Sequence, residues 1–238
     1  MTTKDCPPLA DRITKSLLGY GVIAGPIYVV VAVAQVSTRA GFDPARHAVS
    51  QLANGEFGWV QTANFLVTGA MTVAGAVGVG RALRPSRLAG WAAGLLAVYG
   101  MGLIAAGIMR ADPSDGFPPG TPAGMGTMSW HGLGHFLAAG IGFACFVAAG
   151  FVVGAAFARR REVGWAWFSR ITAVAFAASF ALLSSGGGTT AILLFTAAVV
   201  LAWAWLTAVS AKLYGTVGKP QTLAYETATN KDGSSQRQ

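Results

Sequence analysis

The sequence predicts an all-α protein, a polytopic membrane helical bundle of six transmembrane helices with a short interfacial helix on the outer side. The first observation is composition, because 53% of the 238 residues are hydrophobic and only 11% are charged, whereas soluble domains carry about 25% charged residues. The second is a mean hydropathy of +0.53 for the whole chain. The third is the recurrence of apolar runs of about 20 residues, the length of helix that crosses a bilayer.

Six apolar segments define the predicted transmembrane domain, residues 16–213. The expected spans are 16–37, 61–83, 88–109, 131–157, 165–183 and 189–213. Residues 1–15 are predicted to form a polar N-terminal tail, and residues 214–238 a polar tail of a composition typical of disorder. We expect the first span to be retained, although Ala32-Val33-Ala34 resembles a signal-peptide cleavage site, because its apolar run exceeds the core of about 7–15 residues typical of such peptides.

The distribution of lysine and arginine predicts the orientation of the bundle. Six spans place both termini on one side, which carries 14 of the 17 Lys and Arg residues, and the opposite side carries only Arg39, Arg46 and Arg110. The positive-inside rule then predicts a cell-membrane protein with both termini in the cytoplasm. The net charge of +8 is therefore a topology signal, and we expect the lipid bilayer, and no nucleic acid, as a partner.

The polar segment after the first span predicts a short helix over 43–54. Asp43-Pro44 is a good helix start and Asn54-Gly55 a good stop. Apolar residues recur between them at helical spacing, and another face of the same helix carries His47, Ser50, Gln51 and Asn54. Such a helix is too short to span a bilayer. Its polar face either lies in interfacial water or points into a site between the helices, which would be an outward-facing polar pocket.

The spacing of two histidines raises the possibility of a metal site. His131 and His135 are four residues apart at the start of the fourth span, so their imidazoles share one helix face. Zinc is the candidate cofactor, because a catalytic zinc needs three protein ligands and a position for water. His47 is the candidate third ligand, with Asp112 as the alternative, and Ser50 and Asp112 are the candidate catalytic residues. The alternative is that the histidines hydrogen-bond to neighbouring helices or interfacial water.

Several of these motifs together resemble the bacterial membrane family catalogued as domain of unknown function 998. The motifs are Phe42-Asp43, Arg46-His47-Ala48-Val49-Ser50-Gln51-Leu52, Gly58-Trp59-Val60-Gln61, Asn64-Phe65-Leu66, Asp112-Pro113 and His131-Gly-Leu-Gly-His135. The resemblance covers residues 16–213 and implies a six-helix multi-pass protein without a defined reaction.

A looser resemblance is to the superfamily of membrane hydrolases that contains alkaline ceramidases and adiponectin-type receptors. Those proteins place a serine, an aspartate and several histidines around zinc. The resemblance would assign these roles to Ser50, Asp112, His131, His135 and His47, in a chain of six rather than seven spans.

Three functions follow from these observations. The first is a membrane module that binds a lipid or another membrane protein through its outward-facing pocket. The second is a zinc-dependent membrane hydrolase acting on a lipid-like substrate. The third, a small-solute or proton-coupled carrier, is less favoured because few ionisable residues lie deep in the spans, where carriers usually need them.

Overall fold

The computed structural model describes residues 7–218 except 125 and 187, and within these residues the chain is helical without a strand. Six of its helices are long and apolar enough to cross a membrane. A five-residue 3₁₀ helix, η1, lies between the first two. The helices are α1 (Leu9–Thr38), η1 (Val49–Ala53), α2 (Gly58–Ala82), α3 (Leu88–Ile108), α4 (Trp130–Arg159), α5 (Val163–Ser184) and α6 (Gly188–Tyr214). The predicted six-span all-α fold is confirmed.

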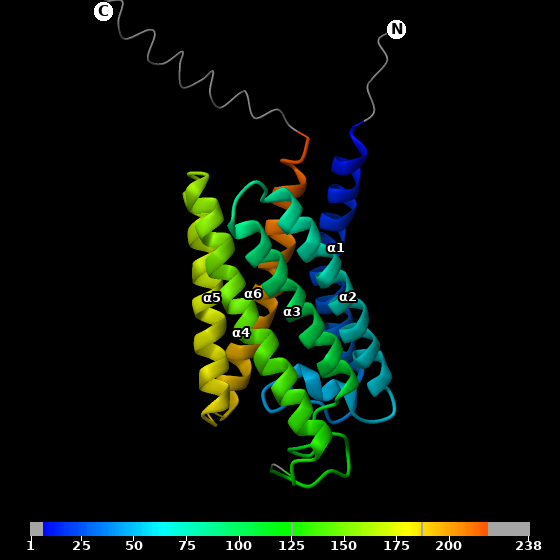
Figure 1. Ribbon diagram of the computed structural model, residues 1–238. Coiled ribbons are helices and arrows are strands. Elements are labelled where there is room, and N and C mark those ends of the chain that lie inside the picture. The colour runs from blue at the N-terminus through cyan, green and yellow to red at the C-terminus, as the bar shows by residue number, and fades with distance from the viewer. Residues whose placement is uncertain (1–6, 125, 187, 219–238) are drawn as a thin grey trace, which may run out of the picture.

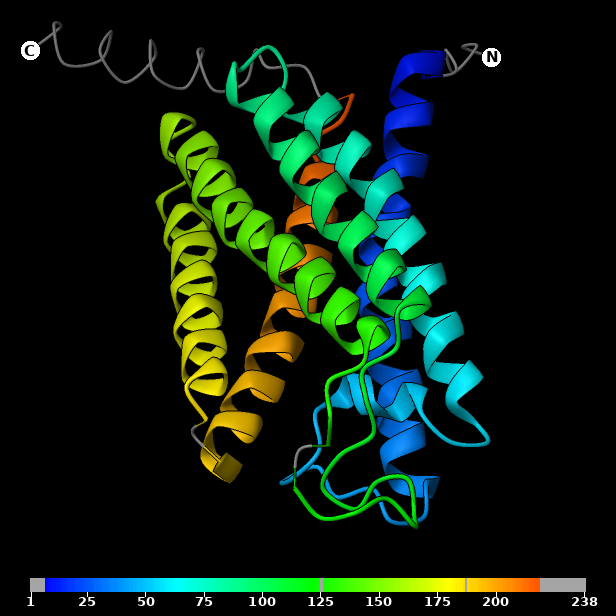
Figure 2. The same ribbon diagram turned by 60° about the horizontal axis from the view of Figure 1, so that its bottom comes forward.

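The six long helices form a closed ring in chain order (Figures 1 and 2). Each helix packs against the next, α6 returns against α1, and α2 also contacts α6. The start of α1 and the end of α6 lie at the same end of the bundle, which we call the terminal end (Figure 1). The segments 39–57 and 109–129 lie together at the opposite end, which we call the loop end.

Three pairs of glycines four residues apart lie in the helices, and two of them, Gly21/Gly25 of α1 and Gly150/Gly154 of α4, bring neighbouring helices into close contact. A Cβ on Gly25 of α1 would lie 2.8 Å from the carbonyl oxygen of Trp203 in α6, and a Cβ on Gly150 of α4 would lie 2.8 Å from a side chain of α5. The third pair, Gly90 and Gly94 of α3, has nothing within 4 Å. Glycine therefore sets the helix separation at the first two places by allowing backbones to approach.

The ends of the first and last helices differ in extent from the predicted spans. α1 begins at Leu9, seven residues before the expected start of the span, so part of the predicted N-terminal tail continues the helix at the terminal end. α6 ends at Tyr214 and is followed by turn residues 215–218. The rest of the predicted C-terminal tail, like residues 1–6, lies outside the described residues.

The predicted α-helix over 43–54 is wrong in type and length, although a short helix does lie at the loop end. Ala48 is extended, with φ −64° and ψ 146°, which interrupts any helix through the segment. The turn before it is held by side chains, since Asp43 Oδ1 accepts the amide of Ala45 and the amide of Asp43 donates to Nδ1 of His47 at 2.9 Å. Such local side-chain bonds compete with helix formation, and only η1 remains.

Candidate functional site

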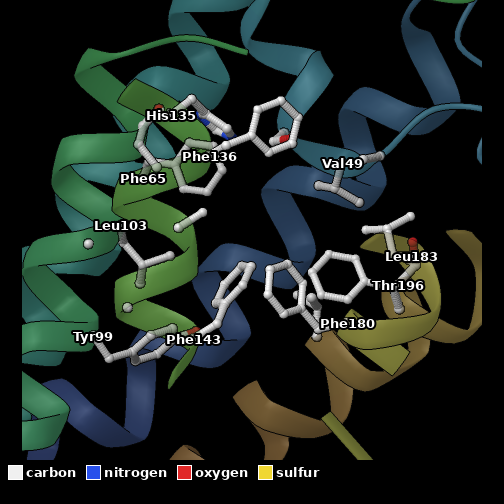
Figure 3. A pocket seen from close by; sticks show the side chains of 18 of the residues that line it. Val49, Phe65, Tyr99, Leu103, His135, Phe136, Phe143, Phe180, Leu183 and Thr196 are labelled. Atoms are coloured by element: carbon white, nitrogen blue, oxygen red, sulfur yellow. Dashed lines mark hydrogen bonds between the residues drawn. The ribbon is translucent and has the colours of Figure 1, made fainter. Parts of the chain in front are cut away.

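A cavity of about 110 Å³ lies inside the ring near the loop end and is lined by residues of all six long helices. Residues Ala48, Val49 and Ser50, at the start of η1, cover it from the loop side. Figure 3 shows its other walls, with Leu103 and Tyr99 of α3 on one side and Phe180 of α5 on the other. The cavity therefore lies where the segment 39–57 meets the membrane-spanning helices.

Eight of the twenty residues that line the cavity are Phe, Tyr or Trp. Phe143 of α4 lies with its ring centroid 5.1 Å from that of Phe180 and 5.6 Å from that of Phe195 in α6. Tyr99 and Trp203 line the end farthest from the loops, with their ring centroids 6.3 Å apart. No Asp, Glu, Lys or Arg of the described residues lines this cavity. It is an apolar cavity, whereas the sequence predicted a polar one.

The polar side chains expected in that pocket are instead used to join the two loop-end segments. Gln51 donates to the hydroxyl of Ser114, and the side-chain amide of Asn54 donates to the carbonyl oxygen of Ala111 at 3.0 Å. Asn54 is buried. These bonds turn Gln51 and Asn54 toward the segment 109–129, whereas Ala48, Val49 and Ser50 line the cavity.

His47, a predicted metal ligand, is part of the same junction. Its side chain is only 2% exposed. Nδ1 accepts the amide of Asp43, and Nε2 donates to the carbonyl oxygen of Asp115 at 3.0 Å. Its ring also packs against Phe42 and the fully buried Phe117. Both ring nitrogens are therefore engaged with the backbone.

Asp112, a predicted catalytic residue, holds the start of α4. The hydroxyl of Ser129 accepts the amide of Gly132 at 3.1 Å, so Ser129 is the N-cap of this helix. Asp112 in turn accepts the Ser129 hydroxyl at Oδ1 and the Ser129 amide at Oδ2. The side-chain hydrogen bond from Ser129, followed by the backbone one, lowers the pKa of Asp112, because both bonds favour the ionised carboxylate.

The two histidines at the start of α4 have different surroundings. His131 is exposed and its ring lies against that of Trp130, with centroids 3.5 Å apart. His135 is buried and lines the cavity. Its Nδ1 lies 2.9 Å from the carbonyl oxygens of both Ala106 and Met109. These carbonyls belong to the end of α3, where backbone oxygens lack helical partners, so His135 closes that helix end.

Of the five predicted site residues, Ser50 and His135 line the same cavity. Asp112, His131 and His47 are not among its lining residues. The described residues contain no group of three or more His, Cys, Asp or Glu side chains placed to hold a metal ion. Zinc ligation by His131, His135 and His47, and catalysis by Ser50 and Asp112, stay predictions.

Sequence reasoning missed the aromatic side chains of the cavity, Tyr99, Phe143, Phe180, Phe195 and Trp203. Their spacing gives no signal, because an aromatic residue that lines a cavity and one that fills a core occupy the same apolar helix face. Two of the predicted polar site residues, Ser50 and His135, do line the cavity, at its loop end.

The fold and the cavity define a multi-pass helical membrane protein. Residues 22–212 match the model of the family described as "Protein of unknown function (DUF998)". The match covers most of the chain and all but the outermost parts of the helical bundle, and the protein belongs to this family. No curated protein and no solved structure matches the chain.

Proposed function

We propose that this protein is a lipid-binding module of the cell membrane, with its loop end outside the cell and the hydrocarbon part of a lipid in the cavity. The observation that carries the proposal is an apolar, aromatic cavity near the loop end that its lining encloses only in part. One of its lining residues, Phe136 of α4, is 57% exposed. A hydrocarbon chain in the adjoining leaflet would thus have a route into the bundle.

The charge distribution supports the orientation. The described part of the terminal end carries Arg81, Arg84, Arg87 and the run Arg159–Arg161, whereas the loop end carries Arg39, Arg46 and Arg110. The positive-inside rule places the more basic end in the cytoplasm. Exposed tryptophans near both ends of the bundle, such as Trp59 and Trp91 at 67% and 68% exposure, suit two membrane interfaces.

The chemistry of the lining supports hydrocarbon over water or an ion. An ion would need charged or multiple polar partners, and no charged side chain lines the cavity among the described residues. Cavities with largely apolar walls accept apolar guests, as an apolar cavity of roughly 150 Å³ accepts benzene. A volume of about 110 Å³ therefore suits a segment of one hydrocarbon chain, with the remainder extending toward Phe136.

Lipid retention by the purified protein tests the proposal. Ala139 lines the cavity, and Ala144 lies on the exposed face of the same helix. A tryptophan at 139 would fill the cavity, whereas a tryptophan at 144 would face the bilayer. Native mass spectrometry after release from detergent should show one retained lipid on the parent protein and on Ala144→Trp. The retained fraction should fall about tenfold in Ala139→Trp, the loss expected when about 1.4 kcal/mol of binding free energy is removed.

Equal lipid retention by the two variants would contradict the proposal, because the lipid would then bind elsewhere. A parent protein that retains no lipid would also contradict it, and would favour the alternative in which the loop end binds another membrane protein. Circular dichroism on both variants checks that the helical content is unchanged.

A further inference from the structure

His135 offers one hydrogen-bonding atom to the cavity. Carbonyl oxygens only accept hydrogen bonds, so the two contacts with Ala106 and Met109 assign the ring proton to Nδ1. In the neutral ring, Nε2 is then a pure acceptor. Nε2 has no hydrogen-bond partner within the described residues. His135 as a residue is only 5% exposed, but Nε2 is not one of the fully enclosed unpaired polar atoms of the described residues, so it is open to a small molecule.

An unpaired acceptor in such surroundings favours a ligand that carries a hydrogen-bond donor. A hydrogen bond from the ligand to Nε2 would contribute about 0.5–1.5 kcal/mol net. The nearest cavity walls around His135 are apolar, with Phe136 and Phe65 close by in Figure 3. A ligand that brings a hydrogen-bond donor to this end of the cavity is therefore favoured over one that brings only hydrocarbon.

The charge of the lining restricts what that donor can be. A phosphate or carboxylate has no donor when ionised, and an ammonium group would bring a charge into a lining that has no Asp or Glu among the described residues. A hydroxyl group meets both conditions. It can donate to Nε2, and its oxygen can accept a second hydrogen bond. Ser50, which lines the same cavity, adds another polar group to the lining.

We infer that the ligand is an uncharged lipid alcohol, which donates its hydroxyl hydrogen to Nε2 of His135 and places its hydrocarbon chain among the aromatic side chains of the cavity. The inference rests on the proposed function and adds the chemical class of the lipid. It also gives His135 two roles, closing the end of α3 through Nδ1 and selecting the ligand through Nε2.

The test compares two photoreactive probes that differ in one donor. One is a long-chain primary alcohol with a diazirine in its chain, and the other is its methyl ether, which keeps the oxygen but lacks the hydroxyl hydrogen. The probes label the full-length protein in detergent micelles. The measured quantity is how well the unlabelled alcohol and the unlabelled ether each reduce this labelling. The alcohol should compete about tenfold better than the ether, which is the effect of one hydrogen bond in a buried site. Peptide mapping should place the label on residues of α3 to α6 at the cavity.

Two variants test whether the preference for the alcohol over the ether depends on His135. His135→Phe should label equally with both probes, whereas His131→Phe, one turn away and exposed, should keep the tenfold preference. Continued labelling of His135→Phe by the ether shows that the cavity still forms in that variant. The comparison of probes on the parent protein needs no variant and decides the question if His135→Phe does not fold.

The outcomes separate this inference from the proposed function. Equal competition by alcohol and ether on the parent protein, with both labels lost in Ala139→Trp, would overturn the hydroxyl assignment while leaving hydrocarbon binding intact. Absence of cavity labelling by either probe would contradict the proposed function itself. A tenfold preference that persists in His135→Phe would also overturn the assignment of the acceptor to His135.

Discussion

Gly132 occupies a position in the first turn of α4 where a side chain has little room. A Cβ at this position would lie 2.6 Å from the carboxylate carbon of Asp112. That carboxylate accepts two hydrogen bonds from Ser129, which in turn caps the helix through the amide of Gly132. The absence of a side chain at Gly132 thus allows the loop carboxylate and the helix cap to meet.

We predict that Gly132→Ala lowers the thermal stability of the protein. Alanine normally stabilises a helix relative to glycine by up to about 1 kcal/mol, but here its methyl group would displace Asp112 and cost about 1–2 kcal/mol through loss of the cap. Gly140→Ala is the matched control, since nothing lies within 4 Å of a Cβ at Gly140 in the same helix. Thermal unfolding followed by circular dichroism should show a lower Tm for Gly132→Ala only. A Tm equal to that of Gly140→Ala would contradict this account of Asp112.

Local sequence determines only part of this arrangement. Ser129 was predictable as an N-cap because an N-cap depends on the residues that follow it within one turn. The role of Asp112 was not predictable, because its partner is 17 residues away and the contact depends on the path of the whole segment 109–129. The same holds for His135, whose partners are 26 and 29 residues away.

At the scale of elements, the two loop-end segments act as one unit because His47 joins them. Its Nε2 reaches the carbonyl oxygen of Asp115 and its Nδ1 holds the amide of Asp43. Arg39 adds to the unit by donating to the carbonyl oxygens of Leu52 and Asn54. The unit positions η1 over the cavity.

We predict that His47→Ala loosens this unit without unfolding the bundle. Loss of two partly buried hydrogen bonds should cost about 2 kcal/mol of local opening free energy. The amide of Asp43 loses its acceptor directly, so hydrogen exchange measured by mass spectrometry should quicken by more than about tenfold in the peptide containing Asp43. His131→Ala removes an exposed imidazole and should leave that peptide unchanged. Unchanged exchange in His47→Ala would show that the unit is held by other contacts.

The prediction of a helix over 43–54 shows where periodicity is insufficient. Helical spacing separated Ala48 and Val49, which line the cavity, from Gln51 and Asn54, which bond to the segment 109–129. It placed Ser50 on the polar face, although Ser50 also lines the cavity. The polar face, however, contains side chains that bond to their own backbone and to the segment 109–129. The amphipathic pattern therefore indicated that a short helix lies in this segment, between the cavity and the segment 109–129. The competing side-chain bonds determine that this helix is the 3₁₀ helix η1.

At the scale of the whole molecule, closure of the ring depends on the contact between α1 and α6. We predict that Gly25→Leu prevents this closure, because the added side chain would meet the backbone of Trp203 at 2.8 Å, and a backbone in a packed helix yields only at a cost of about 1–3 kcal/mol. Gly19→Leu places the same side chain on α1 where nothing lies within 4 Å. Size-exclusion profiles and thermal stability in detergent should be impaired for Gly25→Leu alone. Equal behaviour of the two variants would show that the α1–α6 contact tolerates separation.

The proposed orientation predicts which ends of the bundle react with reagents outside the cell. In a background with Cys6→Ser and Cys145→Ser, Glu56→Cys places a thiol at the loop end and Gly164→Cys places one at the terminal end, both at exposed positions. A membrane-impermeant maleimide added to intact cells should label Glu56→Cys, and should label Gly164→Cys only after permeabilisation. The reverse pattern would invert the orientation.

The sequence predicted the number of spans and their order because hydropathy reports directly on burial in lipid. The character of the cavity was not predictable in the same way. Phe143 and Phe180 face the cavity, whereas Phe146 and Phe176 on the same helices are buried in the core. The difference depends on how far α4, α5 and α6 separate near the loop end, and no residue type marks that separation.

The most direct test of lipid binding is a density map of the protein in lipid nanodiscs, obtained by electron cryo-microscopy with a rigid antibody fragment as fiducial. The proposal predicts an elongated density between Phe143, Phe180 and Phe195, ending within hydrogen-bonding distance of Nε2 of His135 and absent from the map of Ala139→Trp. A cavity in the parent protein that is empty, or is closed by rearranged side chains, would contradict it.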